Sequence, residues 1–270
     1  MYNIYSNIVF IVKQKKKPYY DSAAITGMKP KLYFKTEKVK VLINDARQLK
    51  NCKLDKTGFE FFKYDFNINK NKINENIEIY KDKLSKYLKN KIPFKDIIFF
   101  DFTNRSNSKS GAFNHDGQRQ PAERAHVDYT TTSGIKRAKE ILNKNIYNKL
   151  IKDKRRIIQI NIWRPLSNII LSSPLAFADA RSIKKADLIA TDQYFPDRVG
   201  EIYHLAYNPD QKWYWLPKMN SNEFLIFKGW DSSDDKGIVK FTPHTSFNLE
   251  KQDILKNPRE SIEARAFLIL

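Results

Sequence analysis

The segment GEIYHLAYNPDQKWYWLPKMNSNEFLIFKGW (residues 200–230) contains three short runs of apolar and aromatic residues, separated by Asn, Pro, Asp and Ser. Runs of this length between turn-forming residues are typical of β-strands. Comparable runs lie on both sides of the segment: IIQINIW (157–163), LAFADA (175–180), DLIATDQYF (187–195), IVKFTPHTSF (238–247) and SIEARAFLIL (261–270). Because many short strands follow one another at regular spacing, we predict an α+β protein with a jelly-roll, cupin-like core and flanking helices.

The chain shows no internal repeat and no Gly/Ser-rich linker, so we predict one domain over residues 1–270. Within this domain, the strands and one helix of residues 1–125 are expected to pack on a core formed by residues 126–270.

Two segments have the apolar periodicity of surface helices. Residues 73–91 (INENIEIYKDKLSKYLKNK) carry apolar side chains at helical spacing with lysines on the other side, and residues 133–156 form a second amphipathic pattern. Between them, residues 105–123 are polar and irregular in composition. We expect this third segment to be a flexible loop.

The chain carries 49 Lys and Arg against 30 Asp and Glu, which gives a formal net charge of +19. A strong positive charge can indicate a nucleic-acid partner. Here the excess is mostly Lys mixed with Asn and Ile, and no known nucleic-acid-binding pattern accompanies it. We therefore expect the lysines to keep the surface solvated, and we do not expect a nucleic-acid partner.

Cys52 is the only cysteine, so an internal disulfide is excluded and a reducing compartment is expected. The N-terminal apolar run precedes its positive charges, the reverse of a secretory signal, and it is too short to span a bilayer. These features predict a cytoplasmic protein without a membrane-spanning segment. They do not predict an oligomeric state.

The sequence RAHVDYTT (124–131) places His126 and Asp128 one residue apart. In a strand the two side chains would point to the same face, either as half of a metal site or as a polar pair on a solvated surface. Two histidines and one carboxylate form the facial triad of non-haem iron oxygenases. The third ligand would be His115, which lies in a nearby loop, His204, which groups with apolar neighbours, or His244, which we favour because it lies in a late strand.

Two arginines follow His244 in the segment NPRESIEARAFLIL. In a strand, Arg259 and Arg265 face the same way, together with Ser261 and Glu263. Guanidinium groups on an inward face need anions, and arginine suits bidentate binding of a carboxylate. A dicarboxylate bound at the metal would supply such an anion. The alternative is an internal network in which Glu263 neutralises Arg265.

Taken in order, these motifs resemble the Fe(II)/2-oxoglutarate-dependent oxygenases with a double-stranded β-helix core. The resemblance is closest to the group that includes the cephamycin methoxylation component, gibberellin-desaturase-like proteins and fungal meroterpenoid oxygenases. It covers roughly residues 32–270. The residues that carry it are DARQ…LDKTGF (45–59), HVDYT (126–130), NIWRPL (161–166), PLAFADARS (174–182), WYWLPKM (213–219), NEFLIFKGWDS (222–232), PHTSF (243–247) and PRESIEAR (258–265).

The resemblance implies that His126, Asp128 and His244 bind Fe(II), with 2-oxoglutarate and O2 as cosubstrates. It implies hydroxylation or desaturation of a small-molecule natural-product intermediate, with release of succinate and CO2.

The resemblance also implies that an arginine of the last strand holds the distal carboxylate of 2-oxoglutarate. We expect this to be Arg259, with Ser261 beside it in the same 2-oxoglutarate site. Arg265 lies deeper, and we expect it either to reach the metal-proximal carboxylate or to brace Asp128.

Four further residues are candidates for the pocket or for a place behind the metal ligands. Tyr129 and Thr130 follow the HxD pair, and Asn161 and Trp163 share one face of their strand. Packing is the alternative role for Tyr129, Thr130 and Trp163.

Two other functions stay open. A cupin-like metal-dependent hydrolase or isomerase would need the same triad but no dicarboxylate, so both arginines argue against it. A non-catalytic basic binding module would bind nucleic acid in a salt-sensitive way and would show no metal dependence.

Overall fold

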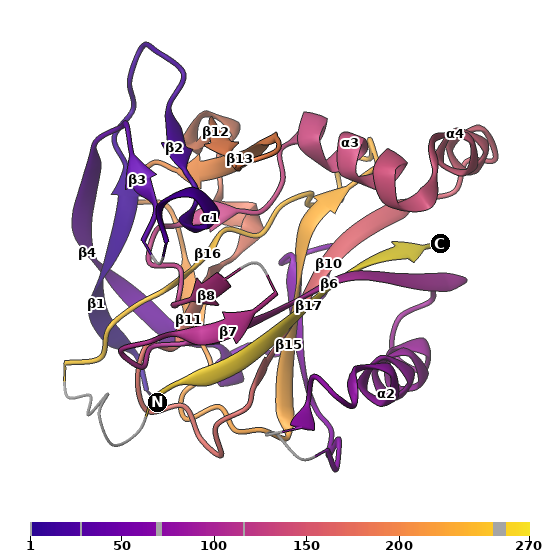
Figure 1. Ribbon diagram of the computed structural model, residues 1–270, viewed down its shortest axis with the longest axis horizontal. Helices are drawn as coiled ribbons and strands as arrows, with labels where there is room; N and C mark the ends of the chain where they lie inside the picture. The colour runs from indigo at the N-terminus through magenta and orange to yellow at the C-terminus, as the bar shows by residue number, and fades with distance from the viewer. Residues whose placement is uncertain (1, 28, 69–71, 116, 251–257) are drawn as a thin grey trace.

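Two β-sheets dominate the computed structural model, which describes residues 2–27, 29–68, 72–115, 117–250 and 258–270 (Figure 1). Within the described ranges, the larger sheet has the strand order β1-β4-β14-β11-β16-β9-β13-β12-β2-β3, and the smaller has the order β5-β15-β10-β17-β6. The larger sheet consists of β1 (Ile4–Ile11), β4 (Thr36–Asp45), β14 (Trp213–Trp215), β11 (Leu175–Ala178), β16 (His244–Ser246), β9 (His126–Val127), β13 (Val199–Leu205), β12 (Leu188–Tyr194), β2 (Tyr19–Asp21) and β3 (Lys31–Leu32). The smaller sheet consists of β5 (Phe59–Lys63), β15 (Glu223–Asp231), β10 (Ile157–Pro165), β17 (Glu260–Ile269) and β6 (Asp96–Ser106).

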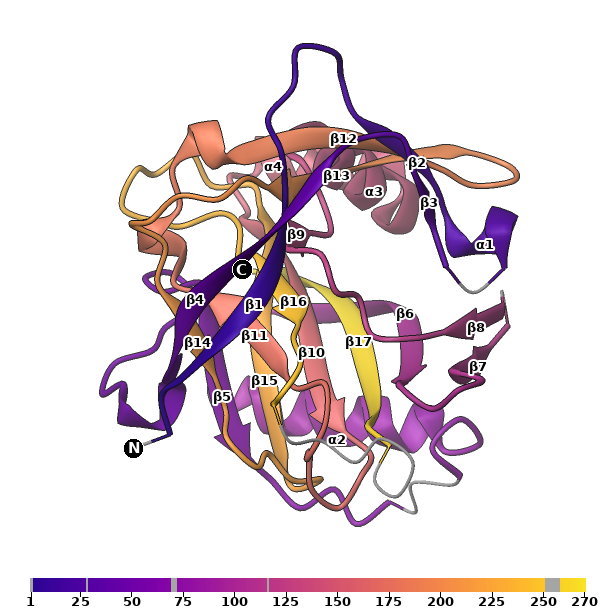
Figure 2. The ribbon, with the colours of Figure 1, turned by 90° about the vertical axis from the view of Figure 1, so that its left-hand side faces the viewer.

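The strand order confirms the predicted jelly-roll core, because neighbouring strands come from distant parts of the chain. β9 lies between β16 and β13, and β11 lies between β14 and β16 (Figure 2). Strands from residues 1–125 take part in both sheets: β4 pairs with β14, β5 with β15 and β6 with β17. The N-terminal segment therefore extends the two sheets as well as packing on them.

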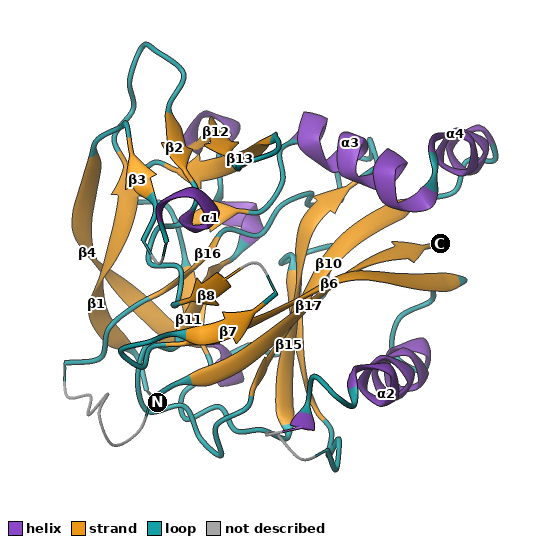
Figure 3. Cartoon of the chain, in the orientation of Figure 1, coloured by secondary structure: helices purple, strands orange, loops and turns teal. Residues whose placement is uncertain are grey.

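Helices lie at the periphery of the strands (Figure 3). The helix α2 (Ile77–Lys89) forms where the sequence predicts it, and its buried residues Tyr80, Leu84 and Leu88 pack with apolar residues of the smaller sheet. Burial of each such side chain contributes about 1.5–3 kcal/mol. Short helical turns are α1 (Ala23–Thr26), η1 (Ala46–Gln48), η3 (Ala180–Ser182) and η4 (Lys185–Asp187). Within the described ranges, every helix falls short of the length and apolarity that crossing a bilayer needs.

The predicted helix over 133–156 is two helices, α3 (Thr131–Leu142) and α4 (Lys144–Lys152). Asn143 separates them with φ 69°, a left-handed conformation that asparagine tolerates, and its side chain accepts a hydrogen bond from the backbone N–H of Asn145. The side-chain periodicity continues across this break, so periodicity alone does not reveal it. Gly134 lets α3 approach the sheet, because a Cβ there would lie 2.3 Å from the Trp230 ring.

The polar segment 105–123 is more regular than predicted. Its first residues, Arg105 and Ser106, end β6, and it contains a hairpin of β7 (Ala112–Asn114) and β8 (Gly117–Arg119). The Asn114 side chain ties this hairpin to β6, since it accepts a hydrogen bond from the backbone N–H of Asn104 and donates one to its carbonyl oxygen. Side-chain bonds of this kind are not visible in a polar composition.

Candidate metal centre

His126, Asp128 and His244 meet where β9 and β16 pair. His126 lies directly opposite His244 in the antiparallel register, and their ring centroids are 4.4 Å apart. One ligand atom from each of the three residues lies within 4.8 Å of the others. Asp128 Oδ1 is 3.4 Å from His126 Nε2 and 3.9 Å from His244 Nε2. The fold thus brings the three predicted ligands to one point.

Backbone carbonyl groups orient both imidazoles. His126 Nδ1 lies 2.7 Å from the carbonyl oxygen of Arg124, and His244 Nδ1 lies 3.2 Å from that of Thr242. Because a carbonyl oxygen can only accept, each Nδ1 carries the proton and each Nε2 keeps a lone pair for a metal ion. Burial, and then the nearby imidazole of His126, lower the pKa of His244 to about 3, so the His244 imidazole is neutral at physiological pH.

The Asp128 carboxylate presents one oxygen to the imidazoles and uses the other for protein contacts. Its Oδ2 accepts hydrogen bonds from Asn161 Nδ2 at 2.7 Å and from Arg265 Nε at 2.8 Å. Burial opposes ionisation of Asp128, but Arg265 and the two imidazoles outweigh it and hold the pKa well below its ordinary value. Two imidazole nitrogens and one carboxylate oxygen fit a divalent transition metal such as Fe(II).

The Arg265 guanidinium is surrounded by acceptors. In addition to Asp128, it donates hydrogen bonds to Asp101, to Thr103 Oγ1 at 3.1 Å and to Glu263. All of its nitrogens have partners. Of the two roles that the sequence left open for Arg265, its geometry therefore matches the bracing of Asp128.

Arg259 has a different environment. It is 2% exposed and donates to the carbonyl oxygen of Ser173 at 2.7 Å and to Ser261 Oγ at 3.1 Å, while its Nε has no partner. In the part of the chain that the structure describes, no carboxylate forms an ion pair with it. Burial, and then the charge of Arg105, lower its pKa to about 9. A buried guanidinium without a carboxylate partner is costly unless an anion joins it.

The remaining candidate residues have mixed roles. Asn161 contacts Asp128, and Trp163 is a core residue whose ring lies 5.4 Å from the Arg259 guanidinium carbon. Tyr129 lines the cavity described below. Thr130 does not line it: Thr130 caps α3 by accepting from Ser133 N at 3.0 Å. The cap therefore accounts for Thr130 as a structural residue.

A cavity of about 890 Å³ opens onto the metal centre. Its wall includes His126, Asp128 and Arg265, and also Tyr20, Arg105 and Arg124, which the sequence did not single out for a site. His204, which the sequence offered only as a less favoured metal ligand, lies in the same wall. Tyr20 on β2 and His204 on β13 reach the cavity through long-range strand pairing, so no local pattern marks their place in its wall. His115, by contrast, is exposed at the β7–β8 turn.

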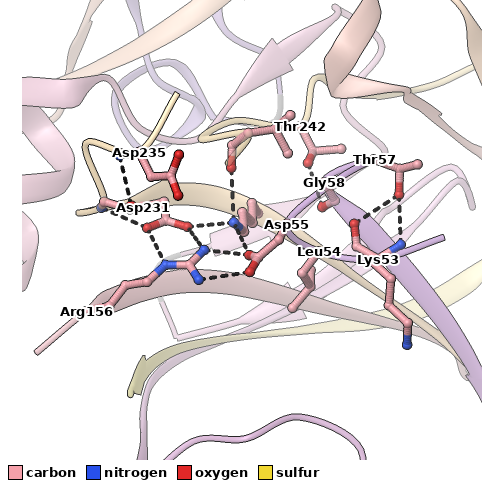
Figure 4. A network of polar contacts seen from close by, with 12 residues as sticks. Lys53, Leu54, Asp55, Thr57, Gly58, Arg156, Asp231, Asp235 and Thr242 are labelled. Atoms are coloured by element: carbon pink, nitrogen blue, oxygen red, sulfur yellow. Dashed lines mark hydrogen bonds and ion pairs between the residues drawn. The ribbon is translucent and has the colours of Figure 1, made fainter. Parts of the chain in front are cut away.

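A buried charged network holds the segment that precedes His244. Figure 4 shows Arg156 between the carboxylates of Asp55 and Asp231. Fully buried Lys228 donates to the same two carboxylates and to the carbonyl oxygen of Val239.

The turn around Gly58 connects this network to the metal centre. Thr242 donates from its backbone N–H to the carbonyl oxygen of Lys228 at 2.9 Å and from Oγ1 to that of Gly58 at 2.7 Å. Gly58 has φ 88°, and a Cβ there would lie 2.3 Å from Thr242 Oγ1. Since the Thr242 carbonyl orients His244, the network fixes the position of that imidazole.

The fold and the three converging side chains define a double-stranded β-helix protein with a site for a two-histidine, one-carboxylate metal centre. A family model described as the oxidoreductase/YMDC permease-like domain matches residues 8–269, and the chain belongs to this family.

Relatives with known names agree with the resemblance seen in the sequence. The chain is 28% identical over 177 residues to the Fe(II)/2-oxoglutarate-dependent dioxygenase nvfI of Aspergillus novofumigatus. The matched segment covers 64% of this chain and 59% of the relative. It is 32% identical over 157 residues to the alpha-ketoglutarate-dependent dioxygenase tstK of Talaromyces stipitatus, covering 55% and 53%. The chain thus spans just over half the length of these two curated relatives.

A solved structure of the iron and alpha-ketoglutarate-dependent endoperoxidase NvfI matches with a TM-score of 0.81 and 25% identity, covering 98% of this chain and 97% of that one. The predicted resemblance and the predicted fold class are therefore confirmed.

Proposed function

We propose that this chain is a non-haem Fe(II)/2-oxoglutarate-dependent dioxygenase that hydroxylates or desaturates a small-molecule natural-product intermediate. The observation that carries the proposal is the convergence of three metal-ligand atoms within 4.8 Å, in a barrel that also buries an arginine without a carboxylate partner among the described residues. The names of the relatives, which include dioxygenases and hydroxylase/desaturases, support it.

We assign the metal ligands to Nε2 of His126, Nε2 of His244 and Oδ1 of Asp128. The carbonyl groups behind the imidazoles hold both nitrogens in the ligating tautomer. Asn161 and Arg265 hold the second carboxylate oxygen and keep Asp128 ionised. When bound, Fe(II) with 2-oxoglutarate and O2 supplies the oxidising power to break a substrate C–H bond, with succinate and CO2 as coproducts.

We assign the distal carboxylate of 2-oxoglutarate to Arg259 and Ser261. Arg259 already directs one nitrogen to Ser261 Oγ, and its Nε is free for an incoming anion. It lies behind Ser173, which lines the cavity and whose carbonyl oxygen it contacts. Arg265 is less suited to this role because its nitrogens already bind Asp128, Asp101 and Glu263.

The organic substrate would enter the cavity beside His126, Asp128 and Tyr129. A volume of about 890 Å³ is within the range of small-molecule sites and leaves room for a multi-ring molecule. The cupin-like hydrolase alternative gives Arg259 no anion to bind, which disfavours it. A single domain over residues 1–270 and a cytoplasmic location belong to the same proposal.

The test is turnover of 2-oxoglutarate by the Fe(II)-loaded protein in air. We expect slow succinate formation without substrate and faster formation with one member of a metabolite panel, whose mass rises by one oxygen atom or falls by two hydrogen atoms. Asp128→Ala should abolish both. Full iron loading without any consumption of 2-oxoglutarate would contradict the proposal and favour the hydrolase.

A further inference from the structure

Three side chains form one wall of the cavity next to the metal centre: Tyr20, Arg124 and His204. His204 on β13 lies directly opposite His126 in the antiparallel register, and Arg124 precedes His126 by two residues. Tyr20 arrives on β2, which pairs with β12. Its ring centroid lies 5.5 Å from that of His204 and 5.6 Å from the Arg124 guanidinium carbon. These three residues are called the β13 wall below.

The β13 wall has hydrogen-bonding groups without partners. His204 is 2% exposed, yet its Nδ1 has no hydrogen bond, and Arg124 Nε is likewise buried without a partner. Buried polar atoms in native proteins are nearly always paired, and an unpaired one costs free energy that a bound group can recover. Both residues line the cavity, so a ligand bound there would lie against them.

The charge balance of the cavity favours an anionic oxygen. Arg265 pairs with Asp101 and Asp128, and Lys17 pairs with the two carboxylates on β12 and β13 that line the cavity mouth. Over the described residues, no carboxylate forms an ion pair with Arg124, and its neighbour Glu123 is exposed. The cavity therefore presents two inward guanidinium groups, those of Arg124 and Arg105, with which no carboxylate among the described residues forms an ion pair.

We propose that the β13 wall binds a carboxylate group of the organic substrate and thereby orients the substrate at the metal centre. Arg124 supplies a charge-assisted hydrogen bond, and His204 and Tyr20 complete the pocket around the carboxylate. This substrate subsite rests on the proposed function. It is separate from the cosubstrate anchor, because Arg259 lies behind Ser173 and does not line the cavity.

The test uses two probes of equal shape, 1-naphthoate and its neutral analogue 1-naphthamide. Binding is measured by calorimetry on the anaerobic Fe(II)-loaded protein with saturating 2-oxoglutarate. We expect the wild type to bind the acid at least about 10-fold more tightly than the amide. Arg124→Gln should weaken acid binding by about 10-fold and leave the amide unchanged, and Arg124→Lys should restore part of the preference.

Arg198→Gln is the matched control, since Arg198 lines the same cavity but its side chain is 60% exposed. It should leave the acid preference intact. His204→Phe keeps a ring against Tyr20, removes the nitrogen and should weaken acid binding without affecting the amide.

Equal binding of acid and amide to the wild type, binding of neither probe, or an acid preference that survives in Arg124→Gln would overturn the subsite. The dissociation constant of 2-oxoglutarate should be the same in all of these variants. If wild-type protein does not bind 2-oxoglutarate, the proposed function fails instead, and the two failures are thus distinguished.

Discussion

Arg265 donates its Nε hydrogen to Oδ2 of Asp128 at 2.8 Å, and the other oxygen of that carboxylate faces His126 and His244. The same guanidinium binds Asp101 and Glu263. One arginine of β17 thus determines which oxygen of Asp128 is available to a metal ion. Asn161, the direct neighbour of Arg265 on β10, holds the same oxygen from the other strand.

Removal of the Asn161 amide should weaken metal binding more than folding. Asn161→Leu loses one of the two hydrogen bonds to Asp128 Oδ2, so the dissociation constant for Fe(II) should rise about 10–100-fold. Anaerobic calorimetry measures this constant, with Asn145→Ala on the exposed surface of α4 as control. An unchanged constant would mean that Arg265 alone suffices to hold the carboxylate.

Replacement of the buried Arg259 should affect 2-oxoglutarate selectively. Because a hydrogen bond to a charged group contributes about 1.5–3 kcal/mol, Arg259→Gln should raise the dissociation constant for 2-oxoglutarate about 10-fold or more and leave that for Fe(II) unchanged. Arg47→Gln is the control, since Arg47 pairs with Glu223 away from the cavity. Wild-type affinity in Arg259→Gln would move the anchor to Arg265.

Loss of the Lys228 ammonium should destabilise the whole protein. Lys228→Met leaves the buried Asp231 with Arg156 as its only cationic partner among the described residues, and breaking a buried ion pair costs about 3–5 kcal/mol. Lys240→Met, which removes a pair with the exposed Asp234, should cost about 1 kcal/mol or less. Urea denaturation of both variants gives the comparison, and equal losses would contradict a dominant role for the network.

Stability should fall with acidity below pH ~6.5 in the presence of EDTA. Burial, together with nearby positive charges, lowers the pKa of His204 and His244, so the unfolded chain takes up protons that the folded chain does not. Stability is therefore present above the unfolded pKa and is lost as pH falls. Between pH 7 and pH 5, protonation of His244 in the unfolded chain should remove about 2 kcal/mol of stability, and His204 should act in the same direction. His204→Phe should reduce this loss of stability, measured by urea denaturation at both pH values. A loss as large as that of the wild type would mean that groups other than His204 cause it.

The sequence predicts the core strands well, because runs such as IIQINIW become a strand that is buried along its whole length, β10. It also predicts the triad, since alternation puts His126 and Asp128 on one side and the order of motifs points to His244. What it cannot predict depends on contacts between distant segments. Tyr20 reaches the cavity through β2–β12 pairing, and the break at Asn143 depends on one residue's backbone conformation.

The assignment of Arg265 was open in the sequence for a similar reason. Two arginines on one face of a strand are equivalent in a pattern, and only their surroundings separate them. Asp101 and Thr103, which engage Arg265, lie on β6, a strand that pairs with β17 although Asp101 precedes Arg265 by 164 residues. Among the described residues, the Arg259 guanidinium donates hydrogen bonds to Ser173 and Ser261, and its Nε is left without a partner.

The most direct measurement of the central claim is the visible absorption spectrum of the anaerobic protein with Fe(II) and 2-oxoglutarate. Chelation of the keto acid by iron held at His126, Asp128 and His244 should produce a weak charge-transfer band, which His244→Ala should lose. A colourless wild-type complex, or a band that persists in His244→Ala, would contradict the assignment of the metal centre.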